Sequence, residues 1–300
     1  MALDRSTLST ALLAIVLIPA CTMPHPRPEV HGHRGCRGLL PENSMPAFLK
    51  ATELGVDYLE MDVVISGDGQ VVISHEPWMN HAICQRPDGT RFTAEEERSF
   101  NLFRMSVPEI QAFDCGSMVD PAFPGQELET AHKPTLRELI ELVDEHAMLS
   151  SVPAPGFNIE IKSDPALYGT YQPAPAIFAI LVLETIDSLG IAERCIIQSF
   201  DPAILEVVHK EREYIRTALL VDNAKDWKAN LASLSYQPEI YSPRADRIDV
   251  QAVKALHALG MEVIVWTVND PKDINAMIHL GVDGIISDYP DRVIAILDGD

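Results

Sequence analysis

The sequence predicts a (β/α)8 barrel, a fold in which eight parallel strands alternate with helices around one axis. Strand-like and helix-like apolar segments alternate along residues 28–300, which is the pattern of an α/β domain. Eight strand-like segments remain for a parallel set once a short hairpin arm is set aside, and no internal repeat is visible. A doubly wound sheet is the alternative that the same alternation allows.

Composition places the chain among globular proteins and argues against one class of partner. Of its 300 residues, 47% are hydrophobic and 22% are charged, which is enough to bury a large core. The formal net charge of -21 argues against a nucleic-acid partner, because no basic surface is left to neutralise a phosphate backbone. Any phosphate group on a substrate must therefore be held by a few local cations.

Residues 1–21 have the layout of an export signal. Arg5 lies in a short head, residues 12–18 form an apolar run, and this run is shorter than the about 20 residues of a membrane-spanning helix. Residues 18–21 also resemble a bacterial lipoprotein cleavage box, after which Cys21 would carry the lipid. We expect a protein of the periplasm or outer membrane, with membrane contact only through this anchor; a plain secretory signal is the alternative.

The first β/α unit begins near residue 30. Residues 30–35 are typical of a strand that runs into a loop, and the sequence at 41–44 is a helix start. An approximately helical apolar stripe at 45–54 ends at Gly55, and the strand at 58–65 follows.

Glu60 and Asp62 share one face of this strand, because residues two apart on a strand point the same way. Two neighbouring carboxylates repel each other unless a cation lies between them. Carboxylate oxygens are the ligands that hard divalent ions prefer, so the pair predicts a Mg²⁺ or Ca²⁺ site.

A hairpin returns the chain from this strand, because the turn sequence at 66–69 leads into an apolar arm at 70–75. A turn at Asp68-Gly69 would place His75 opposite Asp62, and a loop of residues 66–69 would place it opposite Glu60. Both registers put His75 on the carboxylate face, whereas a three-residue loop with a bulge would turn it away.

Residues 76–133 lack clear periodicity and are rich in Pro, Gly, Asp and Arg. The stretch is too long for an ordinary barrel loop, so we interpret it as an insertion that lies over the site. Disulfides are permitted in an exported protein, and Cys84 and Cys115 in this segment are the candidate pair.

Alternation resumes after the insertion. Helices are expected at 135–146, 175–189, 202–210, 227–234, 250–259 and 271–280, and strands at 157–162, 195–200, 217–221, 239–242, 262–268 and 284–287.

In such a barrel, side chains at the carboxyl ends of the strands meet at one mouth. Three carboxylates there could hold a divalent metal, an arginine and a lysine could clamp phosphate, and two imidazoles could move protons. Singly, each residue also has a structural explanation, such as an ion pair or a core aromatic; their convergence favours a catalytic site. The set is His33, Arg34, Glu60, Asp62, His75, Glu160, Lys162, Phe200, Trp266 and Asn269.

Eight short motifs follow one another along the chain. They are His33-Arg34-Gly35, Pro41-Glu42-Asn43-Ser44, Glu60-Met61-Asp62, Ser74-His75-Glu76, Asn158-Ile159-Glu160-Ile161-Lys162, Gln198-Ser199-Phe200, Trp266-Thr267-Val268-Asn269 and Ile286-Ser287-Asp288. In this order they resemble the motif series of the glycerophosphodiester phosphodiesterase family, over residues 31–292. Departures are modest: Cys36 and Arg37 follow the first motif where small residues are usual, and Glu76 replaces a more frequent Asp.

The resemblance implies metal-dependent hydrolysis of a small glycerophosphodiester to glycerol 3-phosphate and an alcohol. The substrate's own glycerol hydroxyl would attack phosphorus, one histidine accepting its proton and the other protonating the leaving alcohol, and water would then open a cyclic phosphate. The metal ligands would be Glu60, Asp62 and Glu160, the acid/base pair His33 and His75, the phosphate clamp Arg34 and Lys162, and the pocket wall Phe200 and Trp266.

Two other interpretations use some of the same residues. His31-Gly32-His33 resembles the first motif of the amidohydrolases, and Lys162 and Asp288 would fit that family, but its further metal-binding histidines are missing from the strands near 198–200 and 217–221. The second is a surface-anchored binding lipoprotein without turnover. The complete histidine and carboxylate set argues against it.

Overall fold

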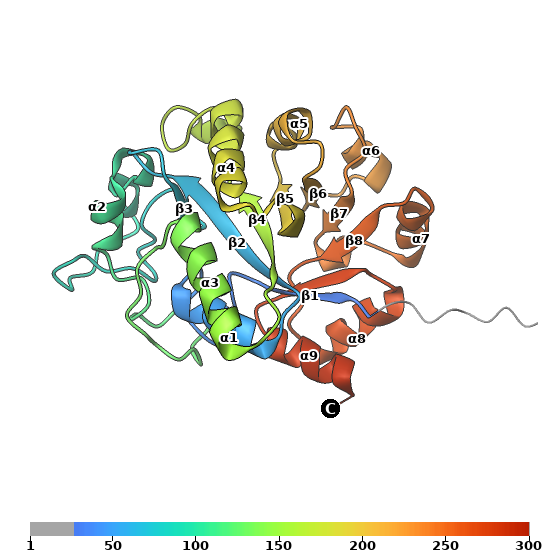
Figure 1. Cartoon of the computed structure of the whole chain (residues 1–300), viewed down its shortest axis with the longest axis horizontal. Coiled ribbons are helices and arrows are strands. Elements are labelled where there is room, and N and C mark those ends of the chain that lie inside the picture. Colours follow the sequence, from blue (N-terminus) through green and yellow to red (C-terminus); the bar gives the residue numbers. More distant parts are fainter. Residues whose placement is uncertain (1–26, 300) are drawn as a thin grey trace, which may run out of the picture.

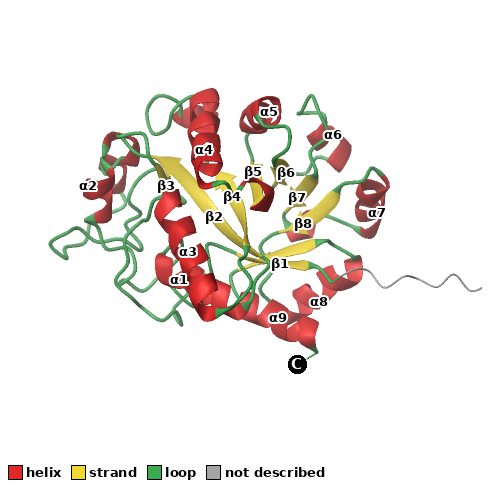
Figure 2. Ribbon diagram, in the orientation of Figure 1, coloured by secondary structure: helices red, strands yellow, loops and turns green. Residues whose placement is uncertain are grey.

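Eight parallel strands form a closed barrel with helices around it (Figures 1 and 2). The computed structural model describes residues 27–299. Because β1 pairs with both β2 and β9, the sheet closes on itself, which confirms the predicted (β/α)8 barrel and excludes a doubly wound sheet. The parallel strands are β1 (Glu29–Gly32), β2 (Tyr58–Ile65), β4 (Gly156–Ile161), β5 (Cys195–Ser199), β6 (Arg216–Val221), β7 (Ile240–Pro243), β8 (Glu262–Val265) and β9 (Gly284–Ser287).

The helices follow the expected order, and several begin where an aspartate accepts a backbone N–H of the first turn, as Asp201 and Asp249 do. Two helices, α2 and α9, were not predicted. The outer helices are α1 (Met45–Leu54), α3 (Leu136–Ser150), α4 (Pro175–Leu189), α5 (Pro202–Glu211), α6 (Trp227–Leu231), α7 (Val250–Ala258), α8 (Pro271–Leu280) and α9 (Pro290–Asp298), and α2 (Val107–Gln111) lies in the 76–133 stretch. Single 3-10 turns occur at Glu97–Ser99, Leu102–Arg104, Pro165–Leu167, Ala192–Arg194 and Ala245–Arg247.

The hairpin after β2 has a different register from either one predicted. β3 (Val71–Ile73) is antiparallel to β2 with Val63 opposite Ile73, so the loop comprises residues 66–70. Backbone N–H of Ser66 donates to Gln70 O, and Gln70 N–H donates to Ser66 Oγ, which closes this longer loop. Both expected even-length loops are therefore wrong, and continuing this register would place His75 opposite Met61.

His75 nevertheless reaches the carboxylate side, because β3 ends at Ile73. Ser74 still donates its N–H to Asp62 O, and its hydroxyl donates to Glu76 O, which turns the chain there. The turn, and not the strand face, therefore decides where the imidazole lies.

Within residues 27–299, buried apolar side chains form three clusters. The largest packs the outer side of the barrel against the helices, and a small one of Ile196, Ala218, Ile240, Ile264 and Ile286 fills the barrel itself. A third belongs to the 76–133 stretch and packs on Val64 and Val72 of the β2–β3 hairpin. The stretch therefore rests on the hairpin that leads to His75, and in Figure 1 it lies to one side of the barrel beside β2 and β3.

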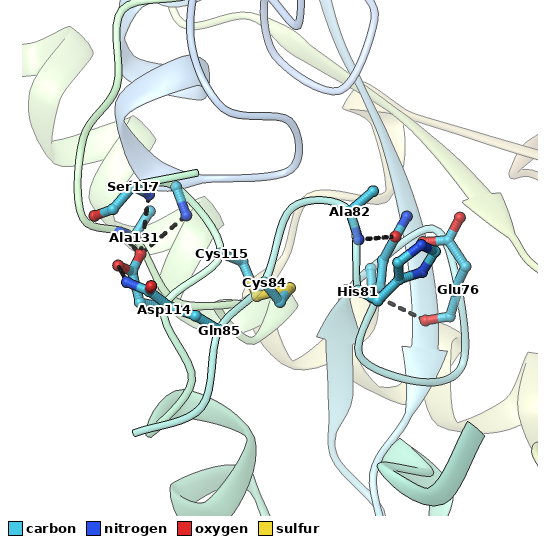
Figure 3. Close-up of a disulfide and its surroundings, with 12 residues drawn as sticks. Glu76, His81, Ala82, Cys84, Gln85, Asp114, Cys115, Ser117 and Ala131 are labelled. Atoms are coloured by element: carbon cyan, nitrogen blue, oxygen red, sulfur yellow. Dashed lines mark hydrogen bonds between the residues drawn. A yellow bond between two sulfur atoms is a disulfide. The ribbon is translucent and has the colours of Figure 1, made fainter. Parts of the chain in front are cut away.

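Cys84 and Cys115 form a disulfide in this third cluster, as Figure 3 shows. Gln85 follows Cys84, and Asp114 precedes Cys115. These two residues exchange backbone hydrogen bonds, and Gln85 Nε2 donates to Asp114 Oδ2 at 2.7 Å. The bond closes a loop across a sequence separation of 31 residues. It therefore joins two distant parts of the irregular stretch.

Removing the disulfide by Cys84→Ala with Cys115→Ala should lower the free energy of unfolding by about 2–4 kcal/mol, since the unfolded chain regains the freedom of that loop. Thermal or urea unfolding of the oxidised wild type and the double variant measures the effect. Reduction of the wild type with dithiothreitol should give the same loss. Equal stability of all three forms would show that the bond does not stabilise the fold.

Among the described residues, no helix has the length and apolar character needed to span a membrane. The expected export signal at residues 1–21, with Cys21, lies outside the described residues.

Candidate active site

The loop after β1 is shaped around Glu60. Arg34 adopts a left-handed backbone conformation, with φ 49°, and donates its backbone N–H to Glu60 Oε2 at 2.9 Å. Gly35, with φ 86°, lies so close to Ala47 on α1 that a Cβ would meet its backbone at 2.7 Å. The loop is therefore pressed between α1 and the carboxylate, and the Arg34 side chain turns into the barrel mouth.

A cavity of about 290 Å³ opens at this mouth. Eight of the nine predicted site residues with assigned roles line it, and the ninth, Asp62, is buried. Asn269 supports Asp288 by a hydrogen bond instead of lining the cavity. The lining includes His33, Arg34, Glu60, His75, Glu160, Lys162, Phe200 and Trp266, together with Arg37, Gln198, Leu220, Thr267 and Ile286.

Glu60, Asp62 and Glu160 form a carboxylate cluster at the cavity. One oxygen of each lies within 4.8 Å of the others, and all three residues are buried. The strand register explains why the three carboxylates are close. Glu60 and Asp62 are two residues apart on β2 and share one face, and Glu160 on β4 is directly opposite Asp62. This arrangement fits a divalent cation bound by oxygen ligands.

The electrostatics of the cluster show why a cation belongs there. Burial, and then the charges of Asp62 and Glu160, raise the pKa of Glu60 well above its usual value. Burial acts in the same direction on Asp62, but Arg34, His75 and Lys162 outweigh it and hold the pKa of that carboxyl far below its usual range. Like-charge repulsion is thus concentrated on Glu60, and a divalent cation would relieve it.

Two cations lie next to the same carboxylates. Arg34 Nε is 3.1 Å from Asp62 Oδ2, and its Nη1 donates to Glu42 Oε2 at 2.8 Å. Lys162 Nζ is 2.7 Å from Glu160 Oε1 and 3.8 Å from Asp62 Oδ1. The pKa of Lys162 is raised, because Glu160 and Asp62 outweigh the effect of burial, so its ammonium stays charged.

Each of the two histidines has a carboxylate behind it. His33 Nδ1 is 2.5 Å from Asp288 Oδ1, and Asn269 Nδ2 donates to the other Asp288 oxygen at 2.7 Å. Burial would raise the pKa of Asp288, but the charge and hydrogen bond of His33 lower it, so Asp288 is ionised. An ionised Asp288 holds the proton on Nδ1 and leaves Nε2 of His33, 3.9 Å from Glu60 Oε2, facing the cavity.

The second pair joins His75 to its own neighbour. His75 Nδ1 is 2.7 Å from Glu76 Oε1. Burial opposes ionisation of Glu76, but the hydrogen bond and charge of His75 lower its pKa to about 2. His75 therefore also has Nδ1 fixed and Nε2 available for proton transfer.

Phe200 and Trp266 form the apolar side of the cavity. Their rings meet edge to face with centroids 5.5 Å apart, and Trp266 Nε1 donates to Ser242 O at 2.9 Å. Lys162 Nζ lies 5.8 Å from the Phe200 ring centre, so the apolar wall adjoins the cationic side.

The residues that the sequence left without a role are the partners of the site residues. Gln198 Nε2 donates to Glu60 Oε1 at 2.9 Å, and Asn43 Nδ2 donates to Asp62 Oδ2 at 2.9 Å. Glu42, Asn43, Gln198 and Asp288 lie inside the motifs, which was the available signal, but the contact between His33 and Asp288 spans 255 positions and is set by the closed barrel. No local pattern gives such a pairing.

His31 does not join His33, as a metal site of the amidohydrolase type would need. Its ring is fully buried and stacks on Tyr58 with centroids 4.7 Å apart, and Asn158 Nδ2 is 3.3 Å from its Nδ1. This histidine does not line the cavity, and it packs on Tyr58, which lies against the small cluster inside the barrel.

Comparison with known proteins agrees with this geometry. The chain is 30% identical over 270 residues to a glycerophosphodiester phosphodiesterase of Caldanaerobacter subterraneus subsp. tengcongensis, covering 89% of this chain and 97% of the relative. A crystal structure from Silicibacter pomeroyi, of a protein provisionally named a glycerophosphoryl diester phosphodiesterase, is 32% identical, with TM-score 0.81 and coverage of 91% and 94%. An Oleispira antarctica phosphodiesterase solved with its product sn-glycerol-3-phosphate is 22% identical and shares the fold, with TM-score 0.70 and coverage of 91% and 97%.

A family model described as the glycerophosphoryl diester phosphodiesterase family matches residues 33–292, which run from His33, directly after β1, into α9. The chain belongs to the glycerophosphoryl diester phosphodiesterase family.

Proposed function

We propose that the protein hydrolyses small glycerophosphodiesters to glycerol 3-phosphate and an alcohol, in a reaction that depends on a divalent metal ion. The observation that carries the proposal is that three kinds of group meet at one cavity. They are the carboxylate cluster, the cations Arg34 and Lys162, and two histidines that each pair with a carboxylate. This combination suits a phosphoryl transfer that needs charge neutralisation and proton transfer at one phosphorus.

Arg34 and Lys162 bind the phosphate in this proposal. Both are charged, both line the cavity, and each is fixed by carboxylates behind it, so they present donors to a phosphodiester without reorganisation. Phe200 and Trp266 bound the apolar side and hold the carbon skeleton of the substrate.

The two histidines divide the proton transfers. One imidazole accepts the proton of the glycerol hydroxyl as that oxygen attacks phosphorus, and the other donates a proton to the leaving alcohol. A cyclic phosphate results, and water opens it with the roles reversed. Asp288 and Glu76 keep Nδ1 of each ring occupied, so that Nε2 carries out the transfer in both cases.

Glu60, Asp62 and Glu160 would hold the cation, which we propose to be Mg²⁺ or Ca²⁺ because every ligand is oxygen. Bound there, a divalent cation supplies neutralisation of phosphate charge and polarisation of the P–O bond.

Export is a second part of the proposal. The layout of residues 1–21 supports a signal, and the Cys84–Cys115 disulfide supports an oxidising compartment such as the periplasm. Lipidation at Cys21 would anchor the protein in the outer membrane. Metabolic labelling with a radioactive fatty acid should mark the wild type and not Cys21→Ser; equal labelling would contradict lipidation at that residue.

A soluble form that begins at Thr22 should release glycerol 3-phosphate from glycerophosphocholine or glycerophosphoethanolamine. EDTA should abolish release, and adding back one divalent ion should restore it, because the carboxylate cluster would then again hold the ion that neutralises phosphate charge. An enzyme-coupled assay for glycerol 3-phosphate measures both. Activity that persists unchanged in EDTA would contradict metal dependence.

Absence of release from either substrate with any added ion would favour a larger glycerophosphodiester. If a panel including glycerophosphoinositol also gave no product, the binding-protein interpretation would replace the enzyme.

A further inference from the structure

Arg37 lines the catalytic cavity three residues beyond Arg34, and the chemistry above gives it no task. Its Nε lies 2.6 Å from Glu42 Oε2, the same oxygen that accepts a hydrogen bond from Arg34 Nη1. One buried carboxylate therefore holds two guanidinium groups side by side. Each arginine has a second carboxylate partner, Asp62 for Arg34 and Asp120 for Arg37.

The 76–133 stretch supplies the other contacts of Arg37. Its Nη2 is 3.6 Å from Asp120 Oδ2, and its Cζ lies 4.6 Å from the centre of the Phe123 ring. Gln126 Nε2 donates to the backbone oxygens of Arg37, at 2.5 Å, and of Leu40, at 3.1 Å. Residues 120–126, called here the arginine-holding segment, therefore fix both the backbone and the guanidinium of Arg37.

The side chain of Arg37 is fixed by these contacts but remains partly exposed. It keeps 22% of its exposure, whereas the side chains of its partners Glu42 and Asp120 keep only 5% and 9%. Part of the Arg37 side chain therefore stays accessible, and the residue lines the cavity. This is the arrangement of an arginine prepared to bind an anion.

We infer that Arg37 is a third cation of the phosphate site, and that the insertion takes part in substrate binding by holding this arginine in place. The inference rests on the proposed function. Arg37 contacts a phosphate oxygen, which every substrate of this reaction and the product glycerol 3-phosphate share. Its contribution should therefore not depend on which alcohol the substrate carries.

The test compares Arg37→Met, Arg37→Lys and Asp120→Asn with the wild type. Arg37→Met should weaken binding of sn-glycerol 3-phosphate, measured by calorimetry, and raise KM, each by about 10-fold or more, as for loss of a hydrogen bond to a charged group. kcat should change less than KM, and Arg37→Lys should recover part of the binding. Asp120→Asn leaves Arg37 in the chain but removes the charge of one of its carboxylate partners. It should weaken binding and raise KM by a smaller factor than Arg37→Met.

Arg137→Met is the matched control, because Arg137 is an exposed arginine on α3 paired with Glu141, away from the cavity. It should bind glycerol 3-phosphate as the wild type does. Unfolding temperatures of all variants separate a local loss of binding from a general loss of folding.

The outcomes distinguish this inference from the proposed function. A wild type without turnover would sink the function, while calorimetry would still report whether Arg37 binds the phosphate. An active wild type with equal product affinity in Arg37→Met would overturn the inference and leave the function intact. A KM effect confined to one of glycerophosphocholine and glycerophosphoethanolamine would place Arg37 at the alcohol and overturn its assignment to phosphate.

Discussion

His33→Ala and His75→Ala should each lower kcat by about 10²-fold or more, since each removes one of the two groups proposed to transfer protons. KM should change less, because Arg34 and Lys162, the proposed phosphate ligands, remain in the cavity. Steady-state release of glycerol 3-phosphate from glycerophosphocholine or glycerophosphoethanolamine, whichever the wild type turns over, measures both constants at saturating metal.

His81→Ala is the control for these two variants. His81 lies in the same 76–133 stretch as Glu76 and also has a carboxylate on Nδ1, Glu97 Oε2 at 2.6 Å, but it does not line the cavity. Its replacement should leave kcat near the wild-type value. Turnover near the wild-type value in either His33→Ala or His75→Ala would remove that histidine from the acid/base pair.

Glu160→Gln should raise the concentration of divalent ion needed for half-maximal activity by about 10-fold or more, the scale seen when groups around a metal are replaced. Glutamine keeps the size of the side chain but removes one of the three negative charges of the carboxylate cluster. Titration of the metal-free protein with Mg²⁺ and with Ca²⁺, followed by calorimetry and by activity, measures the shift without relying on turnover alone.

Glu262→Gln is the matched control on another strand of the barrel. Glu262 is also a strand carboxylate bound to a cation, Arg216, but it belongs to β8 and does not line the cavity. Its metal requirement should equal that of the wild type. If Glu160→Gln also left the requirement unchanged, Glu160 would be the ion-pair partner of Lys162 and not a metal ligand.

The sequence predicted which side chains share a face within a single strand. Glu60 and Asp62 project together because strand residues alternate, and the structure buries both next to Glu160. The alternation of strands and helices also predicted the barrel, because the spacing of apolar residues distinguishes a strand from a helix within each segment. α9 was missed because the expectation stopped at the eighth strand.

Contacts between distant segments could not be read in the same way. His33 and Asp288 meet because β1 pairs with β9 when the sheet closes, and Arg37 meets Asp120 because the insertion folds back over the loop after β1. Composition and spacing carry no signal for such pairings.

The hairpin shows the division most clearly. The sequence alone determined that a turn follows β2 and that His75 comes after it, because glycine and aspartate at a strand end favour reversal of the chain. Only the tertiary structure decided the register, because the bonds between Ser66 and Gln70 close a five-residue loop and Ser74 ends the strand. Local periodicity thus determined which residues could carry the chemistry, while hydrogen bonds across the closed barrel decided where their side chains meet.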